Sequence, residues 1–248
     1  MYNPFSLVGK TILVTGASSG IGKATAIECS KMGARVVITG RNRLRLEDTF
    51  NQLEGENHLQ VIADLCSNEN FEMLVNELSI VDGVVHCAGI VDPVPFQFIN
   101  SEKLNKIFSV NFFSPILLTR EMLKRKLIAK NSSIVFISSI SGTICSSVAG
   151  SMYSATKGAI YGMVKGMALD LAPKFIRVNT IQPGMISTNI FEDGRVTNEQ
   201  LQEDINKYPL KRYGKPEEVA HAVIYLLSDA SSWITGSNLL IDGGYTLL

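Results

Sequence analysis

A glycine-rich turn between a short apolar strand and a helix constrains this 248-residue chain more than any other feature. The run TILVT, residues 11–15, favours a buried strand, and a helical pattern extends from Lys23 to Met32. The turn between them reads GASSGIG, residues 16–22. In such a turn one glycine permits the tight bend, one lets backbone approach a pyrophosphate, and one allows the helix to pack closely. We therefore expect residues 16–22 to hold the phosphates of a dinucleotide against a helix N-terminus.

The alternation of strand and helix continues along the rest of the chain. Further strands are predicted at 33–39, 59–63, 80–86, 134–138, 175–181 and 237–241, and helical stretches at 42–53, 67–79 and 101–128. Such alternation implies a parallel sheet with helices on both faces, and right-handed crossovers leave few topologies. The sequence shows no repeat and no linker, so we expect one α/β domain over residues 1–248.

Composition argues against several classes of protein. Basic and acidic residues both number 23, which disfavours a nucleic-acid or membrane-surface protein. The four cysteines are widely spaced and form no metal motif, so we expect no metal site and a reduced compartment. No apolar stretch approaches the length that spans a bilayer, and the N-terminus has no signal-peptide pattern. These features predict a soluble cytoplasmic protein.

The end of the second strand predicts which dinucleotide is bound. In a dinucleotide-binding fold an acidic residue at this place binds the ribose 2′-hydroxyl, whereas an arginine accommodates a 2′-phosphate. This chain has Gly40-Arg41 there and no acidic residue. We therefore expect NADP(H) in preference to NAD(H). The alternative is that Arg41 is an ordinary solvated arginine of a loop.

The catalytic candidates lie in the segment SISGTICSSVAGSMYSATK, residues 139–157. Tyr153 and Lys157 are four residues apart, which on a helix puts a phenol and an ammonium one turn apart on the same face. A nearby cation favours the phenolate, so we expect Lys157 to lower the pKa of Tyr153 towards the range useful for proton transfer. Ser139 follows the apolar run IVFIS and would lie at a carboxyl strand end, where ligands bind in such sheets. Ser141 competes with Ser139 for this role.

Two further segments bear on the site. The helical stretch 101–128 is interrupted around Asn111-Phe-Phe-Ser-Pro115, because proline removes a backbone donor and can bend a helix. A bend there would free a carbonyl at Asn111 to hold a water molecule. The polar, weakly patterned stretch 189–212 follows a predicted ligand loop, and we expect it to form a lid over a pocket.

Taken together, these pieces resemble the short-chain dehydrogenase/reductase family over essentially the whole chain. The resemblance is carried by motifs in the family's order: the turn at 16–22, Asp64-Leu65, Ala88-Gly89, Asn111, Ser139, Tyr153 with Lys157, Pro183-Gly184, Thr188 and Asp242-Gly-Gly244. It implies a doubly wound Rossmann-type fold with a seven-stranded parallel sheet.

The resemblance also implies a role for each candidate. Tyr153 would be the general acid/base, and Lys157 would hold the nicotinamide ribose. Ser139 would orient the substrate oxygen, Asn111 would position a water in the proton relay, and Ile186 with Thr188 would hold the carboxamide. The cofactor-binding set is then Gly16, Ser18, Ser19, Gly20, Ile21, Gly22, Arg41, Asp64, Leu65, Cys87, Ala88, Gly89, Tyr153, Lys157, Pro183, Gly184, Ile186 and Thr188.

One departure concerns the segment after the fourth strand. Where the family usually has Asn-Asn-Ala-Gly, this chain has His86-Cys87-Ala-Gly. The missing asparagine braces neighbouring strands in the family, so the change predicts weaker cofactor binding or lower stability.

The resemblance is nearest to bacterial 3-oxoacyl-[acyl-carrier-protein] reductases, so a small-molecule or carrier-bound carbonyl compound is the expected substrate. Reductases or dehydrogenases of steroids, sugars or polyols are the alternatives. A catalytically idle cofactor-binding scaffold and a methyltransferase-like nucleotide binder are the competing classes. Lys130 and Lys174 would flank the pocket mouth and meet an acidic carrier protein. The family also implies a homo-oligomer, either a tetramer or a dimer.

Overall fold

Seven parallel strands form one sheet in the computed structural model, which describes residues 2–188 and 198–248. The spatial order is β3-β2-β1-β4-β5-β6-β7, and neighbouring strands pair in parallel throughout. The strands are β1 (Thr11–Thr15), β2 (Arg35–Gly40), β3 (Leu59–Ile62), β4 (Val81–His86), β5 (Ile128–Ile137), β6 (Arg177–Pro183) and β7 (Asn238–Ile241). This arrangement confirms the predicted doubly wound fold with a seven-stranded parallel sheet.

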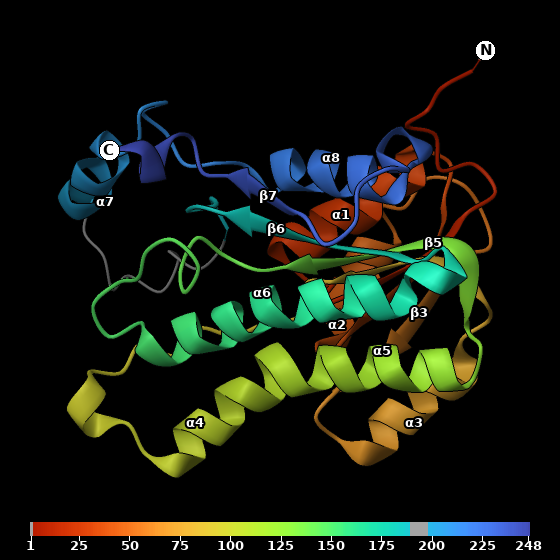
Figure 1. The fold of residues 1–248 in the computed structure, drawn as a ribbon, viewed down its shortest axis with the longest axis horizontal. Helices are drawn as coiled ribbons and strands as arrows, with labels where there is room; N and C mark the ends of the chain where they lie inside the picture. Colours follow the sequence, from red (N-terminus) through yellow and green to blue (C-terminus); the bar gives the residue numbers. More distant parts are fainter. Residues whose placement is uncertain (1, 189–197) are drawn as a thin grey trace.

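Helices cover both faces of the sheet (Figure 1). On one face, α1 (Gly20–Lys31), α2 (Arg43–Phe50) and α8 (Pro216–Leu227) share one apolar core with the strands. On the other face, α3 (Asn68–Glu77), α5 (Ser114–Lys124) and α6 (Ser151–Leu171) share a second core. Further helices are η1 (Phe96–Phe98), α4 (Ser101–Phe108), α7 (Asn198–Asn206) and the short turns η3 (Ala172–Lys174), η5 (Asp229–Ser231) and η6 (Tyr245–Leu247).

The predicted helix over 101–128 is wrong at its C-terminal end. The helix stops at Lys124, and β5 begins at Ile128. Lys126 takes a left-handed φ of 58°, and the Leu127 amide donates to the Met122 carbonyl at 2.8 Å. These features form a helix stop that turns the chain into the next strand.

The predicted interruption of that helix is confirmed. Residues Ser109–Phe113 form a π-helical turn, η2, between α4 and α5. Pro115 has no N–H, so it cannot make the usual α-helical hydrogen bond to the carbonyl of Asn111. The wider turn accommodates this missing donor and moves Asn111 into a buried position, with its side chain 2% exposed.

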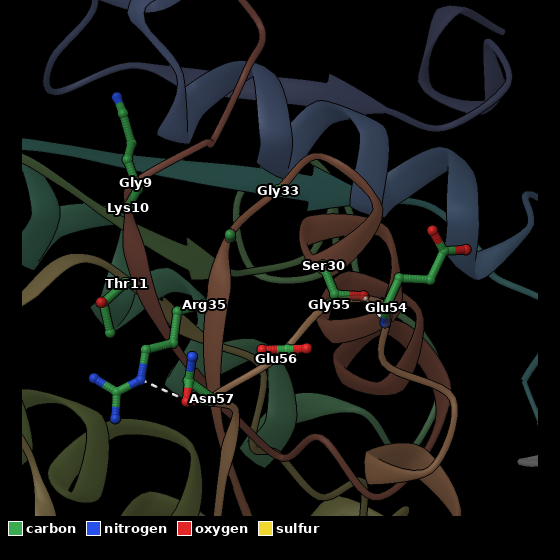
Figure 2. A pocket seen from close by; sticks show the side chains of 11 residues that line it. Gly9, Lys10, Thr11, Ser30, Gly33, Arg35, Glu54, Gly55, Glu56 and Asn57 are labelled. Carbon is green, nitrogen blue, oxygen red and sulfur yellow. Dashed lines mark hydrogen bonds between the residues drawn. The ribbon is translucent and has the colours of Figure 1, made fainter.

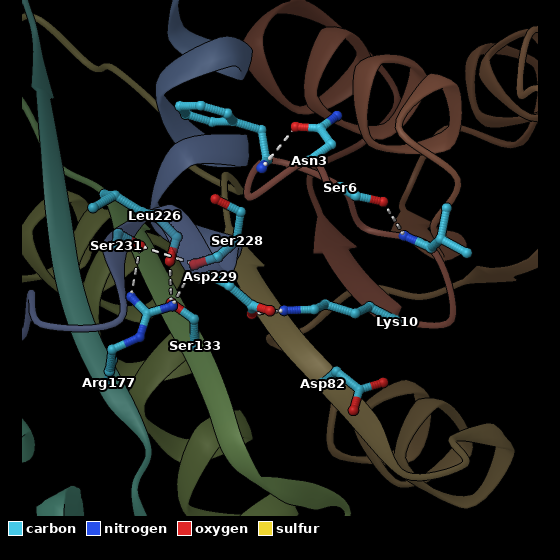
Figure 3. Close-up of polar contacts among 12 residues, drawn as sticks. Asn3, Ser6, Lys10, Asp82, Ser133, Arg177, Leu226, Ser228, Asp229 and Ser231 are labelled. Carbon is cyan, nitrogen blue, oxygen red and sulfur yellow. Dashed lines mark hydrogen bonds and ion pairs between the residues drawn. The ribbon is translucent and has the colours of Figure 1, made fainter. Parts of the chain in front are cut away.

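Polar contacts close the edge of the sheet at the amino ends of the strands (Figure 3). The guanidinium of Arg177 on β6 donates to the Ser231 hydroxyl at 2.9 Å and to the Ser228 carbonyl at 3.2 Å. The Ser133 hydroxyl on β5 donates to the Leu226 carbonyl at 2.7 Å. Arg177 therefore satisfies carbonyls beyond the end of α8 and ties that helix to the sheet.

Candidate active site

The predicted site residues gather at the opposite edge, where the strands have their carboxyl ends. The residues that follow six successive strands are Gly16 (β1), Arg41 (β2), Asp64 (β3), Cys87 (β4), Ser139 (β5) and Gly184 (β6). Because all the strands are parallel, these ends meet along one edge, which is where ligands bind in open α/β sheets. Figure 1 shows the arrowheads of β6 and β7 pointing towards this edge.

The glycine-rich turn is shaped by close backbone contacts. Gly16 has a φ of 67°, and a Cβ atom there would lie 2.6 Å from the Ala88 nitrogen. A Cβ atom on Gly22 would lie 2.3 Å from the Gly16 carbonyl oxygen. The third glycine of the motif therefore lets the first turn of α1 pack on the turn itself, whereas we expected contact with the strand. Ser19 is the N-cap residue of α1.

Lys157 is a buried cation beneath the predicted catalytic tyrosine. Its side chain is 6% exposed, and its ammonium donates to the Ile137 carbonyl at 2.7 Å. Burial disfavours the charged form and lowers the pKa of Lys157 to about 8. The ammonium nitrogen lies 3.8 Å from the place where a Cβ atom would stand on Gly89, so it reaches the loop after β4.

Tyr153 and Ser139 face each other across the site. Burial raises the pKa of Tyr153, and a hydrogen bond with Ser139 opposes that rise. This differs from the expected lowering by Lys157, whose nitrogen lies 5.6 Å from the centre of the Tyr153 ring. Ser141 is directed elsewhere, because its hydroxyl is paired with the Ser154 hydroxyl at 2.9 Å. The geometry therefore favours Ser139 over Ser141 as the partner of Tyr153.

The side chain of Asn111 clamps the loop after β4. Its oxygen accepts from the Ile90 amide at 2.8 Å, and its nitrogen donates to the Ile90 carbonyl at 2.9 Å. The same nitrogen donates to the Thr156 hydroxyl at 3.2 Å. With both side-chain atoms engaged, the backbone carbonyl of Asn111 is the group left for the water-holding role that the family implies.

Sequence reasoning missed Thr156, which links Tyr153 on α6 to Asn111. Its hydroxyl is fully buried, donates to the Tyr153 carbonyl at 2.7 Å and accepts from Asn111. Its position three residues after Tyr153, on the same inward face of α6, was a signal that could have identified it.

Arg41 is an exposed residue that directly follows β2. The side chain is 60% exposed, and its guanidinium is 3.8 Å from the Asp64 carboxylate. Ser18 is on the same side, because its hydroxyl lies 3.2 Å from the place where a Cβ atom would stand on Gly40. Asp64 also accepts from the Cys66 amide at 3.0 Å, which holds the loop after β3. Leu65 packs partly against the second apolar core.

His86 and Cys87 replace the expected asparagine pair with different contacts. The buried His86 ring stacks on Phe136, with 4.6 Å between ring centres, and its Nε2 is 2.8 Å from the Thr119 hydroxyl. Cys87 packs partly against the first core, and burial raises the pKa of its thiol to about 12. Bracing between β4, β5 and α5 is therefore supplied by His86.

The loop after β6 carries the residues predicted to hold the carboxamide. Ile186 is buried, and the Thr188 hydroxyl is a buried atom without a hydrogen-bond partner among the described residues. Thr188 lies next to the glycine turn, since its methyl carbon is 3.2 Å from the place of a Cβ atom on Gly20. Within the predicted lid, 189–212, residues 189–197 lie outside the described residues and 198–206 form α7.

Two other features lie away from this edge. A cavity of about 460 Å³ opens at the amino ends of β1 and β2, between Lys10, Arg35 and Asn57 (Figure 2). It is therefore separate from the candidate active site at the carboxyl edge. Lys130 is near the start of β5, and Lys174 lies three residues before the start of β6. The expectation that these two lysines flank the pocket mouth is therefore wrong within one chain, because they lie at the amino end of the sheet.

Among residues 2–188 and 198–248, no group of three metal-ligating side chains could hold a metal ion. In the same ranges, the helices are too short or too polar to cross a membrane.

Comparison with known proteins agrees with this geometry. The family model described as enoyl-(acyl carrier protein) reductase matches residues 16–246. The 3-oxoacyl-[acyl-carrier-protein] reductase FabG of Rickettsia conorii is 34% identical over 98% of this chain and 99% of its own length. The L-xylulose reductase of Caenorhabditis elegans is 31% identical over 98% of both chains. The solved structure of a mutant short-chain dehydrogenase/reductase of Serratia marcescens superposes with a TM-score of 0.89, at 28% identity, over 98% of this chain and 100% of that one. The chain therefore belongs to the short-chain dehydrogenase/reductase family of oxidoreductases.

Proposed function

We propose that this enzyme is an NADP(H)-dependent reductase of apolar carbonyl compounds, with a 3-oxoacyl thioester as the best candidate substrate. The observation that carries the proposal is the buried Lys157 ammonium, which donates to the Ile137 carbonyl at 2.7 Å and lies 5.6 Å from the centre of the Tyr153 ring, at the strand end that precedes Ser139. This arrangement places a proton donor, an orienting hydroxyl and a cation at one strand end.

The residues at the carboxyl edge fit a nicotinamide dinucleotide. The glycine turn and the N-terminus of α1 would hold the pyrophosphate, Arg41 the 2′-phosphate, and Lys157 the nicotinamide ribose. The partnerless hydroxyl of Thr188 would meet the carboxamide. When bound, the dinucleotide supplies or accepts the hydride.

Side chains of the protein supply the proton that the reduced carbonyl oxygen needs. Because burial raises its pKa, Tyr153 keeps its proton at neutral pH and can donate it to the oxygen of a carbonyl group as that oxygen gains charge. The Ser139 hydroxyl donates a hydrogen bond to the same oxygen, and the fixed Lys157 ammonium stabilises the phenolate that is left.

Apolar side chains near the site favour an acyl chain over a sugar. The loops after β4 and β5 are joined by a hydrogen bond from the Val94 amide to the Ala149 carbonyl at 3.0 Å. These loops expose a set of apolar side chains: Val91, Phe96, Phe98, Ile144 and Val148. A polyol would leave these groups without contacts, whereas an acyl chain would cover them. The sugar relatives nevertheless make a polyol the second candidate.

A substrate panel tests this assignment. NADPH oxidation is measured with 3-oxoacyl thioesters of increasing chain length on a small thiol, and with a ketopentose. We expect kcat/KM to rise with chain length and to be low for the sugar. Activity confined to the sugar would contradict the acyl assignment and support the polyol alternative.

Replacement of Arg41 tests the cofactor preference. We expect Arg41→Ala to weaken NADPH binding by about 10- to 100-fold, the loss for a charge-assisted contact, and to leave NADH binding nearly unchanged. Arg45→Ala, which removes an exposed charge further along α2, is the matched control. Equal affinity of the unsubstituted protein for NADPH and NADH, measured by calorimetry, would contradict the preference.

The outer face of α4 to α6 supports a homo-oligomer. Leu104, Phe113, Leu117 and Met163 are large apolar residues that this face exposes. An apolar face of this kind is typical of an interface between copies of a chain, and sedimentation velocity measures the resulting mass. The four free cysteines agree with a reduced, cytoplasmic location.

A further inference from the structure

The loop that follows β6 is held in place by contacts from three segments. The Gly184 amide donates to the Ile241 carbonyl on β7 at 2.8 Å. The Met185 carbonyl accepts from the Gly214 amide at 3.0 Å, and the Ser187 amide donates to the Gly214 carbonyl at 2.8 Å. The Met185 amide donates to a side chain, the hydroxyl of Tyr208, at 3.2 Å. This loop presents Ile186 and Thr188 to the site.

Tyr208 is a rigid support for that amide. Its side chain is 4% exposed, and its ring lies 4.8 Å from the ring of Tyr245 and 5.6 Å from the ring of Tyr213. The Leu210 amide donates to the Gly243 carbonyl at 3.3 Å, which ties this stretch to the C-terminal segment. Burial raises the pKa of Tyr208 to about 12, so its hydroxyl stays neutral over the working range of pH.

We infer that Tyr208 is a positioning residue for the nicotinamide end of the cofactor. Its hydroxyl fixes the Met185 amide, and the loop beyond Met185 then presents the partnerless Thr188 hydroxyl at the required place. This inference rests on the proposed function. Tyr208 contacts the loop after β6 and the rings of Tyr213 and Tyr245, so we expect its influence at the end of the cofactor that carries the carboxamide.

The test compares two ligands that share every phosphate. NADPH contains the nicotinamide, whereas 2′-phospho-ADP-ribose lacks it and still occupies the adenine and pyrophosphate sites. We expect Tyr208→Phe to weaken NADPH binding by about five- to tenfold, the effect of losing one hydrogen bond, and to leave binding of 2′-phospho-ADP-ribose unchanged. Calorimetry on the full chain measures both dissociation constants, and thermal denaturation checks that the variant is folded.

Tyr213→Phe is the matched control. It removes a hydroxyl from the same aromatic cluster, but that hydroxyl donates to the Asp204 carboxylate at 2.8 Å. We expect its affinity for both ligands to equal that of the unsubstituted protein. Equal weakening of both ligands by Tyr208→Phe, or no change in NADPH binding, would overturn the positioning role.

A second measurement does not depend on the folding of the variant. Hydrogen exchange of the unsubstituted, ligand-free protein should be slow at the Met185 amide, because it donates to the hydroxyl of the buried Tyr208 side chain. Fast exchange there would overturn the inference. If the unsubstituted protein bound 2′-phospho-ADP-ribose but not NADPH, the proposed function would fail along with this inference. If the unsubstituted protein binds both ligands and only the expected effect of Tyr208→Phe is missing, the inference fails and the proposed function stands.

Discussion

Tyr153→Phe is expected to reduce kcat for carbonyl reduction by about 10²- to 10⁴-fold, the contribution of a positioned general acid. The substitution removes the hydroxyl that pairs with Ser139 and retains the ring, which packs against the cluster of Val94, Ile107 and Met152. The ring is the part that contributes to the apolar core, so we expect stability and NADPH affinity to change little. Steady-state kinetics and calorimetry measure the two effects separately.

A second tyrosine on α6 provides an unusually close control. Tyr161 and Lys165 repeat the spacing of Tyr153 and Lys157, two turns further along the same helix. The Lys165 ammonium lies 4.2 Å from the centre of the Tyr161 ring, yet Lys165 is exposed to solvent. Tyr161→Phe should therefore retain full activity. Near-normal turnover of Tyr153→Phe would contradict the mechanism, because the phenolic proton would then not be needed for the reaction.

This duplicated spacing shows what a short motif can and cannot predict. Tyr153 with Lys157 and Tyr161 with Lys165 are equivalent as patterns, but burial separates them, since Lys157 is 6% exposed. The sequence analysis chose Tyr153 with Lys157 because Ser139 and the family's other motifs accompany this pair. The lowered pKa of Lys157 and the raised pKa of Tyr153 depend on depth in the fold, and periodicity carries no information on depth.

Elements with strong local signals were predicted well. The strand, glycine turn and helix at residues 11–32 and the parallel sheet follow from patterns that need no tertiary information. The predicted end of the helix now labelled α5 was wrong because a lysine, Lys126, takes the left-handed conformation at the helix stop. Glycine usually occupies that position and makes it recognisable in a sequence. Tyr208 could not be predicted, because 23 residues separate it from Met185 and the stretch between them is weakly patterned. The roles of Tyr153, Lys157, Asn111, Ser139 and Arg41 stay predictions.

The second large effect is expected from pH. His86 is buried against Phe136, and burial lowers its pKa from 6.5 to about 3. Its Nε2 serves as the donor to Thr119, because the Thr119 hydroxyl itself donates to the Pro115 carbonyl at 2.9 Å. The Nδ1 atom is then the unprotonated nitrogen, and it is buried without a partner among the described residues. The folded state thus holds a neutral imidazole that resists protonation.

The sign of the effect follows from proton counting. Below about pH 6.5 the unfolded chain binds a proton at His86 and the folded protein does not, so the free energy of unfolding falls as the pH is lowered. The loss should be about 1.4 kcal/mol per pH unit between the two pKa values, or about 2 kcal/mol at pH 5. Above about pH 7 the group should contribute no pH dependence. Urea denaturation of the cofactor-free protein at a series of pH values measures this slope.

Substitution isolates His86 from the carboxylates that titrate in the same range, such as Glu218, whose hydrogen bond with Arg212 lowers its pKa to about 2. His86→Asn introduces the residue that the family usually has at this place. We expect the free energy of unfolding of this variant to change less with pH, and the difference in slope is the contribution of His86. Its stability at neutral pH is not the test, because the stacking on Phe136 is lost as well. His221→Asn removes an exposed histidine 3.6 Å from Glu28 and should leave the slope of the unsubstituted protein intact. If the profiles of His86→Asn and the unsubstituted protein were parallel between pH 7 and 5, His86 would not be the neutral, proton-resistant group that its burial requires.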